Sequence, residues 1–283
     1  MSKRLKNTLF ILSVILVLGF SGACSLRSTA LKFSDSLILF QIDKMFDLTE
    51  EQEQYLEPKI EKFVNWLKVE KSNNVISSLE ALRKNLKDGL NKEEYLQVRR
   101  SFKAVLVESK QFLKSDFLWL MKSLSDEQLK HFSNFLSETN EDIEERLGSN
   151  DFESDQLEKI KERTERIYGE LTSGQDKELL KLVRSKKDLE AYLTQREVSQ
   201  RFVLEKIRIG RQYPELHTEV FEALISSPEN LRPKEYIEEY LIMSKHWNTI
   251  WVETDKIMND SQRKHAQSFV SDLIADLLDW SKV

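Results

Sequence analysis

The sequence contains a single cysteine, Cys24, so no intramolecular disulfide can form and the stability of the fold must come from its core. Glycine and proline are scarce, at seven and four residues, so long segments run without the residues that interrupt helices. β-branched residues never alternate with polar residues over a useful length, which argues against strands. These absences predict an all-α protein, an elongated bundle of about nine or ten helices without a sheet.

Sequence motifs of common enzymes are also missing. There is no Gly-x-Ser-x-Gly turn, no glycine-rich phosphate loop and no His-Glu-x-x-His zinc motif. The many carboxylate pairs, such as Glu50/Glu51 and Glu238/Glu239, lie on helix faces and are typical of solvated surfaces. We therefore expect no enzymatic activity, no catalytic residue and no cofactor.

Histidine occurs four times, and two of the four share a pattern. Gln128-Leu129-Lys130-His131 and Gln262-Arg263-Lys264-His265 each place Gln and His three residues apart on one helix face. Metal sites in helical bundles use Glu at the first of these positions, and Gln is a poor ligand. We expect hydrogen-bonded or surface histidines here and no metal site.

The N-terminal segment has the features of a targeting signal. Three cations precede a largely apolar run of about 13 residues, which is short for a membrane span. Small residues then precede Cys24, as in a bacterial lipobox. We expect residues 1–23 to be a lipoprotein signal peptide, Cys24 to carry the lipid and residues 24–32 to form a tether. An uncleaved membrane anchor and ordinary cleavage after Ala23 are the alternatives.

Ser25, rather than an aspartate, follows the cysteine, and this resembles the sorting signal of lipoproteins that are sent to the outer membrane. The expected location is therefore the cell envelope, with a lipid anchor in the outer membrane and the protein facing the periplasm. Removing residues 1–23 removes three positive charges and changes the formal net charge from −5 to −8. This acidic balance argues against nucleic acid as a partner and against a basic face that binds anionic lipid.

Residues 33–283 are expected to form the helical domain, either as one elongated domain or as two halves that meet near residues 148–155. That stretch is small, acidic and aperiodic. Pro58 should kink or split the helix that contains it, because proline has no amide hydrogen to donate. Asn91 starts the clearest helix pattern, which runs for about 30 residues to Leu120.

A short motif recurs four times and predicts helix starts. Thr, Ser or Asn is followed three residues later by Gln, which is the pattern of a capping box. In this motif the first side chain and the Gln side chain each bond to the other residue's backbone amide. The four pairs are Thr49/Gln52, Ser125/Gln128, Thr172/Gln175 and Asn259/Gln262.

Trp247 and Trp251 are neighbours on one helix face beside His246. Core packing is the default interpretation for all five tryptophans. An exposed aromatic ledge formed by Trp247 and Trp251, which would bind a peptide or lipid of a partner, is the alternative.

The order of several motifs resembles a known family. A lipobox is followed by Asp47-Leu48-Thr49 with Trp66 downstream, and then by the segment 124–131. After these come 166–171, Gln195-Arg196-Glu197 and 262–266. This order resembles the bacterial lipoprotein family with domain of unknown function 6279, across essentially the whole mature chain. The resemblance implies a helical, lipidated, periplasm-facing protein and implies no established activity.

The Leu-Thr-x-x-Gln stretch at Leu48 also looks like a motif of Spy- and CpxP-type periplasmic chaperones. Three functions are therefore weighed. The first is a non-enzymatic envelope lipoprotein that binds a protein partner, as a scaffold or assembly factor. The alternatives are a holdase-like chaperone and an enzyme with an unrecognised site. The expected contacts are the membrane, through lipid on Cys24, and a protein of unknown identity.

Overall fold

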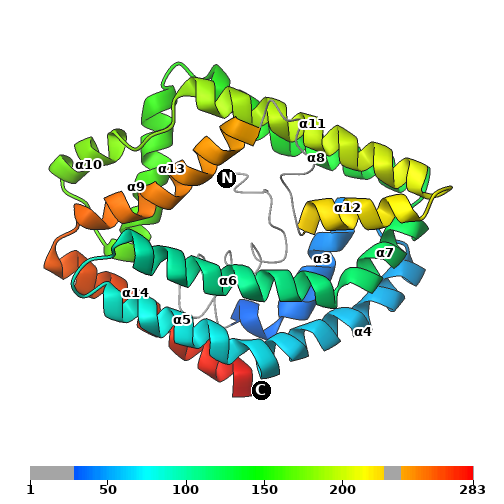
Figure 1. The fold of residues 1–283 in the computed structure, drawn as a ribbon, viewed down its shortest axis with the longest axis horizontal. Coiled ribbons are helices and arrows are strands. Elements are labelled where there is room, and N and C mark those ends of the chain that lie inside the picture. Colours follow the sequence, from blue (N-terminus) through cyan, green and yellow to red (C-terminus); the bar gives the residue numbers. More distant parts are fainter. Residues whose placement is uncertain (1–28, 226–236, 283) are drawn as a thin grey trace. The chain divides into compact units, whose positions relative to one another are not determined.

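The computed structural model describes residues 29–225 and 237–282, and every regular element in these ranges is helical (Figure 1). The predicted all-α class is confirmed. The described residues form twelve α-helices, slightly more than the nine or ten expected, and one short π-helix. The α-helices are α3 (Ser34–Phe46), α4 (Glu50–Trp66), α5 (Ser72–Asn85), α6 (Lys92–Phe112), α7 (Lys114–Ser123), α8 (Asp126–Gly148), α9 (Phe152–Tyr168), α10 (Ser173–Leu180), α11 (Lys186–Gly210), α12 (Glu215–Ile225), α13 (Ile237–Lys256) and α14 (Asp260–Lys282).

The long helix expected after Asn91 is divided at Leu113 into α6 and α7. Leu113 has φ −89° and ψ 2°, which lies outside the helical region. The aromatic residues on either side pack against different helices. Phe112 stacks on Trp66 at 4.9 Å between ring centroids, and Phe117 contacts Phe221 of α12 at 5.4 Å. Tertiary packing therefore interrupts a segment whose local pattern is continuous.

Pro58 does not split its helix, because α4 runs through it. Leu56 and Ile60 beside it are buried, with 4% and 3% of their surfaces exposed. Core packing thus holds the turn in which proline removes one backbone hydrogen bond. The α-helical hydrogen bonding changes later, at the π-helix Leu67–Lys71 that joins α4 to α5.

The chain forms two compact units that are interleaved in sequence. The first unit comprises Met1–Glu70, Leu106–Ile143 and Thr194–Pro233, and the second comprises Lys71–Val105, Glu144–Leu193 and Lys234–Val283. The stretch 148–155, expected to lie between two halves, falls inside the middle segment of the second unit. Three long helices, α6, α8 and α11, each contribute residues to both units.

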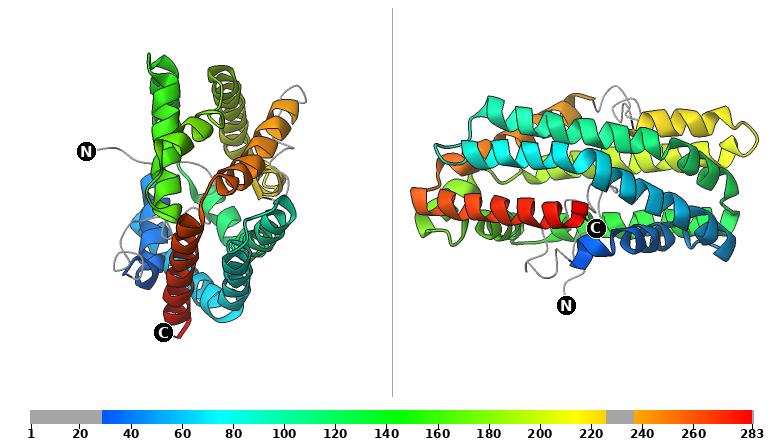
Figure 2. Two further views of the ribbon diagram at one scale, coloured as in Figure 1. Left: turned by 90° about the vertical axis from the view of Figure 1, so that its left-hand side faces the viewer. Right: turned by 90° about the horizontal axis from the view of Figure 1, so that it is seen from below.

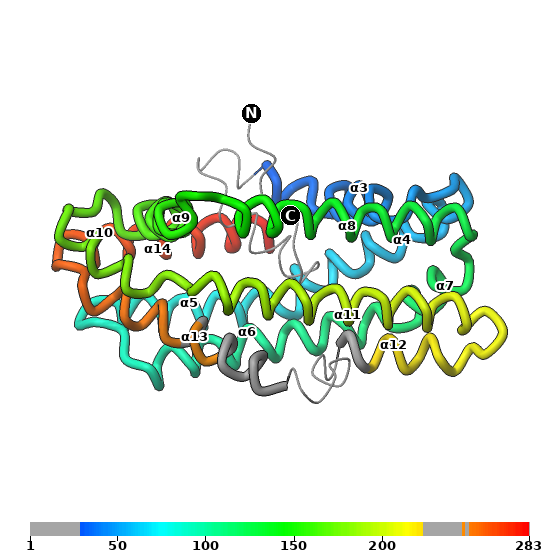
Figure 3. Tube along the Cα trace, turned by 90° about the horizontal axis from the view of Figure 1, so that it is seen from above, coloured from blue at the N-terminus to red at the C-terminus, as the bar shows by residue number. Residues whose placement is uncertain are grey.

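In the first unit, α3 and α4 lie side by side (Figure 3). Leu56, Ile60 and Phe63 of α4 recur at steps of four and three residues and are buried, as expected for the inner face of an amphipathic helix. Phe46 at the end of α3 packs on Phe132 of α8, with 4.6 Å between ring centroids. These contacts fix the α3–α4 hairpin on the start of α8.

In the second unit, α5 and α14 lie side by side (Figure 2). They share a buried cluster of Ile76, Leu79, Leu86, Tyr168, Met258, Ala266, Val270 and Ile274. The α14 members recur every four residues, so a single face of that helix supplies them. No helix within the described ranges is both long and apolar enough to span a membrane.

Candidate functional site

The four recurring motifs stand at the starts of α4, α8, α10 and α14. At the first, Thr49 Oγ1 accepts from the Gln52 amide at 3.3 Å, and Gln52 Oε1 accepts from the Thr49 amide at 3.0 Å. The same reciprocal bonds join Ser125 to Gln128, Thr172 to Gln175, and Asn259 to Gln262. Each motif thus satisfies two backbone amides that a helix start leaves without partners.

In the first unit, the glutamines of two of these motifs also bond to each other. Gln52 Nε2 donates to Gln128 Oε1 at 3.2 Å, and Gln128 Nε2 donates to Gln52 Oε1 at 2.6 Å. The Gln52 amide nitrogen also donates to Ser123, whose hydroxyl lies at 2.9 Å and whose carbonyl lies at 3.2 Å. The Gln128 amide nitrogen also donates to the Asp47 carbonyl at 2.8 Å. Both side chains are buried and use their full hydrogen-bonding capacity, so the starts of α4 and α8 are joined through them.

The second unit repeats this arrangement with Gln175 and Gln262. Their Nε2 atoms donate to each other's Oε1 at 2.7 and 3.0 Å, and each also donates to a backbone carbonyl, that of Ile257 or Glu170. The carbonyl acceptors occupy matching places, since Ser123 and Ile257 both lie two residues before the next capping residue. The Leu-Thr-x-x-Gln motif is therefore used inside each unit to join helix starts.

The two histidines of the Gln-x-x-His pattern also have matching contacts. His131 Nε2 lies 3.1 Å from the Lys44 carbonyl, and His265 Nδ1 lies 3.0 Å from the Ile167 carbonyl. Lys44 and Ile167 belong to the last turns of α3 and α9. Each ring thus bonds to a carbonyl that a helix end leaves without an intrahelical partner.

His217 and His246 lie in different environments. His217 is fully buried, and its Nε2 lies 3.0 Å from the Ile207 carbonyl. Burial and the positive charge of Arg184 lower the pKa of His246. Over residues 29–225 and 237–282, no three His, Cys, Asp or Glu side chains are grouped as metal ligands.

A buried polar cluster in the second unit centres on Asp255 of α13. Its carboxylate accepts from the Leu90 amide at 2.6 Å and from the Tyr168 hydroxyl at 3.1 Å. Arg263 donates to the Asp255 backbone carbonyl at 3.0 Å and lies 3.7 Å from the carboxylate. Burial, and then the Asp255 charge, raise the pKa of Tyr168. Because Asp255 and Tyr168 are 0% and 4% exposed, the cluster fixes the chain around Leu90 and presents no reactive group to solvent.

An open groove of about 260 Å³ lies in the first unit between α3 and α4. Its lining contains five carboxylates, Asp35 and Asp43 from α3 and Glu53, Glu57 and Glu61 from α4. The remaining lining residues are Ser36, Leu39 and Phe40. The sequence contained this pattern, since the three glutamates recur every four residues, but acidic helix faces are common and gave no reason to single it out.

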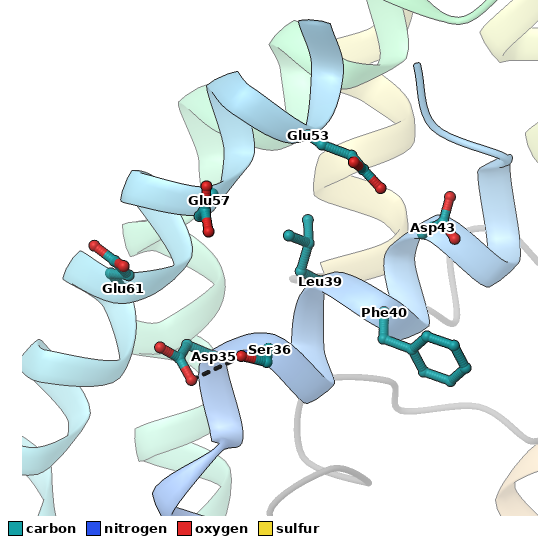
Figure 4. A pocket seen from close by; sticks show the side chains of 8 residues that line it. All are labelled: Asp35, Ser36, Leu39, Phe40, Asp43, Glu53, Glu57 and Glu61. Atoms are coloured by element: carbon teal, nitrogen blue, oxygen red, sulfur yellow. Dashed lines mark hydrogen bonds between the residues drawn. The ribbon is translucent and has the colours of Figure 1, made fainter. Parts of the chain in front are cut away.

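The two helices present their carboxylates from opposite sides of the groove (Figure 4). Asp43 faces the Glu53 end and Asp35 the Glu61 end, while Leu39 points between the helices. The Phe40 ring points away from α4 and is 55% exposed. None of the five carboxylates forms an ion pair with a lysine, arginine or histidine of the described residues.

The remaining predicted site residues fall elsewhere. Cys24 and the signal segment lie outside the described residues, as does the Trp247 side chain. Trp251 belongs to α13 and is half-buried.

A family model described as "Family of unknown function (DUF6279)" matches residues 44–237, more than half of the chain. The matched range begins in the last turn of α3, and it includes α4 with the three groove glutamates. The curated proteins and the solved structures contain no match to the chain.

Proposed function

Since the chain belongs to the DUF6279 family of unknown function, we propose its function from the site itself: a non-enzymatic lipoprotein of the cell envelope that binds a protein partner, as a scaffold or assembly factor. The α3–α4 groove carries this proposal. It gathers five carboxylates on an open surface without a cation of the described chain to neutralise them. Like charges held together in this way cost free energy that a cationic partner surface would recover.

The position of the groove suits a partner close to the membrane. In the proposal, lipid on Cys24 anchors the protein in the outer membrane, facing the periplasm. The start of α3, Ser34, lies ten positions after Cys24 in the chain. A chain of that length reaches at most about 36 Å. A partner bound at α3 would therefore be held near the membrane surface.

The polar clusters described above favour binding over catalysis. The paired glutamines and the Asp255 cluster are buried and hydrogen-bonded, so they serve packing. The groove contains carboxylates and no nucleophilic cysteine, lysine or histidine beside them. Five carboxylates with one serine hydroxyl, Ser36, and no histidine, lysine or cysteine beside it suit recognition of a cation better than nucleophilic catalysis.

Site-specific crosslinking in intact cells tests this function. A photo-reactive amino acid replaces Ser36 in the groove, and Glu51, an exposed α4 residue outside the groove lining, serves as the control. We expect one protein to crosslink at position 36 and not at position 51, and to bind the purified protein. Absence of a defined partner at position 36, in protein that is folded and anchored, would contradict the proposal.

A second measurement separates a dedicated partner from general chaperone activity. Residues 25–283 are mixed with an unfolding client protein and followed by light scattering. We expect no suppression of aggregation at near-stoichiometric ratio. Suppression of several unrelated clients would replace the scaffold function with that of a holdase.

A further inference from the structure

The α3–α4 hairpin of the first unit has an internal counterpart in the α9–α10 hairpin of the second. Both first helices end at a residue with positive φ, Asp47 at 53° and Gly169 at 80°. Both second helices start at a capping threonine. An acidic residue four positions before each helix end accepts from the amide before that threonine: Asp43 from Leu48 at 3.0 Å, and Glu165 from Leu171 at 3.3 Å. The loop from Asp47 to Thr49 is one residue shorter than the loop from Gly169 to Thr172, so positions are matched within each helix by counting from its own end or start.

In the second hairpin, a lysine of the chain occupies the gap between the helices. Lys161 lies eight residues before Gly169. Its Nζ donates to Asp176 Oδ2 at 2.9 Å and lies 4.0 Å from Glu165 Oε1. The hydrogen bond to Asp176 raises the pKa of Lys161. The second hairpin thus carries its own cation between an acid of α9 and an acid of α10.

In the first hairpin, the matching acids are present and the cation is not. Asp43 matches Glu165, and Glu53 matches Asp176, since Glu53 and Asp176 each lie four residues after the capping threonine. Leu39, eight residues before Asp47, stands at the position of Lys161. Asp35 and Glu57 add two further carboxylates, whereas the matching positions of the second hairpin hold Leu157 and Leu180. Glu61 adds a third and has no counterpart, because α10 ends at Leu180. The α3–α4 groove therefore has acids that match those around the Lys161 ammonium group, but it has Leu39 at the position of the lysine.

We propose that the α3–α4 groove binds a basic amphipathic segment of a partner protein, and that a lysine or arginine of this segment takes the place beside Asp43 and Glu53 that Lys161 occupies in the other hairpin. This inference rests on the proposed function and names the chemistry of the partner.

The lining of the groove fits such a segment along its length. Glu53, Glu57 and Glu61 are four residues apart, so they follow one side of the groove for about 12 Å. Cations spaced by one helical turn would match this row. The partly exposed Leu39, which points between the helices, offers apolar surface to the alkyl stems of lysine or arginine. A metal ion fits less well, because no three of the carboxylates are grouped as ligands.

The position of Lys161 in the second hairpin suggests a substitution that should block the α3–α4 groove. Leu39→Lys places a lysine where Lys161 stands and should fill the ammonium position from within. Val69→Lys adds the same charge at a position of the first unit that is 65% exposed and outside the groove. Glu53→Gln with Glu57→Gln removes two groove charges, and Glu51→Gln removes one outside it.

Binding is measured on the full mature chain by fluorescence anisotropy. The probe is a labelled helical peptide with lysine at every fourth position and leucine on the adjoining face, and a peptide with glutamate in place of lysine is the negative control. We expect Leu39→Lys and the double glutamine variant each to weaken lysine-peptide binding about tenfold or more, equivalent to about 1.4 kcal/mol. Val69→Lys and Glu51→Gln should bind as the unmodified protein does. Circular dichroism and thermal unfolding check that Leu39→Lys is folded.

Three results of the binding assay would overturn the inference. They are equal weakening by Val69→Lys and Leu39→Lys, absence of lysine-peptide binding to the unmodified protein, and release of the peptide by stoichiometric Ca²⁺. In cells, the crosslink at position 36 should disappear when Leu39→Lys is introduced. A partner that still crosslinks there in the Leu39→Lys variant would leave the proposed function standing and reject the ammonium site.

Discussion

Gln52 and Gln128 face each other as a closed amide pair, 76 residues apart in sequence, in which each side chain donates to the other. Each glutamine also closes the capping box of its own helix. This buried pair thus joins the capping box at the start of α4 to the capping box at the start of α8. Gln175 and Gln262 form the same pair in the second unit.

Gln128→Glu should destabilise the protein, although glutamate is a normal residue at this position of a capping box. Glutamate has no hydrogen to donate, so it would leave the Gln52 and Asp47 oxygens without their donor and bury a charge. We expect a loss of about 1–3 kcal/mol in the free energy of unfolding, measured by urea denaturation.

The matched control is Gln54→Glu, which makes the same substitution at an exposed position of α4. Gln54 donates only to Glu50, so its replacement should change stability by a few tenths of a kcal/mol. Equal losses for Gln128→Glu and Gln54→Glu would mean that the buried pair adds nothing to stability.

Gly210→Ala should be destabilising because of His217. A methyl group at Gly210 would collide with the His217 ring, which is fully buried and bonded to the Ile207 carbonyl. Overpacking of this kind costs about 1–3 kcal/mol. Gly148→Ala is the control, since nothing lies within 4 Å of its added methyl group. In the α8 helix that change should stabilise by roughly 0.5–1 kcal/mol. Thermal unfolding of both variants tests the contrast.

Tyr168→Phe should alter how stability depends on pH in alkaline solution. An unfolded tyrosine ionises near pH 10.0, whereas burial and the Asp255 charge raise the pKa of Tyr168 in the folded protein. The stabilisation from protonated Tyr168 is complete below pH 10 and is lost as pH rises further, by up to roughly 1.4 kcal/mol per pH unit.

Phenylalanine cannot ionise, so the stability of Tyr168→Phe should fall less steeply above pH 10. At neutral pH the variant should be less stable by about 1–3 kcal/mol, because Asp255 loses a hydrogen bond. Urea denaturation at a series of pH values measures both effects. Parallel curves for the two proteins would show that Tyr168 ionises equally easily in the folded and unfolded chain.

The helix starts were predictable from sequence because a capping box is local. The four residues from the capping threonine to the glutamine contain the whole signal. The structure has the reciprocal hydrogen bonds of a capping box at Thr49 and at Thr172. The break at Leu113 was not predictable in this way. It depends on Phe112 and Phe117 packing on helices that are distant in sequence.

The acidic groove could not be predicted from sequence, because it forms only when α3 and α4 pack together. The sequence showed the glutamates of α4, and only the folded hairpin places Asp35 and Asp43 opposite them. The match between Leu39 and Lys161 emerges when positions are counted from the positive-φ residues Asp47 and Gly169. Asp47 in particular gives no sign in sequence that it ends a helix, because glycine usually fills that role.

The interleaving of the two units has a practical consequence for genetics. Each unit collects its residues from three stretches, and α6, α8 and α11 contribute to both. A truncation that removes any of these stretches therefore removes part of a core, and its phenotype reports loss of folding before it reports loss of a binding surface. Mapping the function of this protein requires single substitutions in an otherwise intact chain, such as Leu39→Lys.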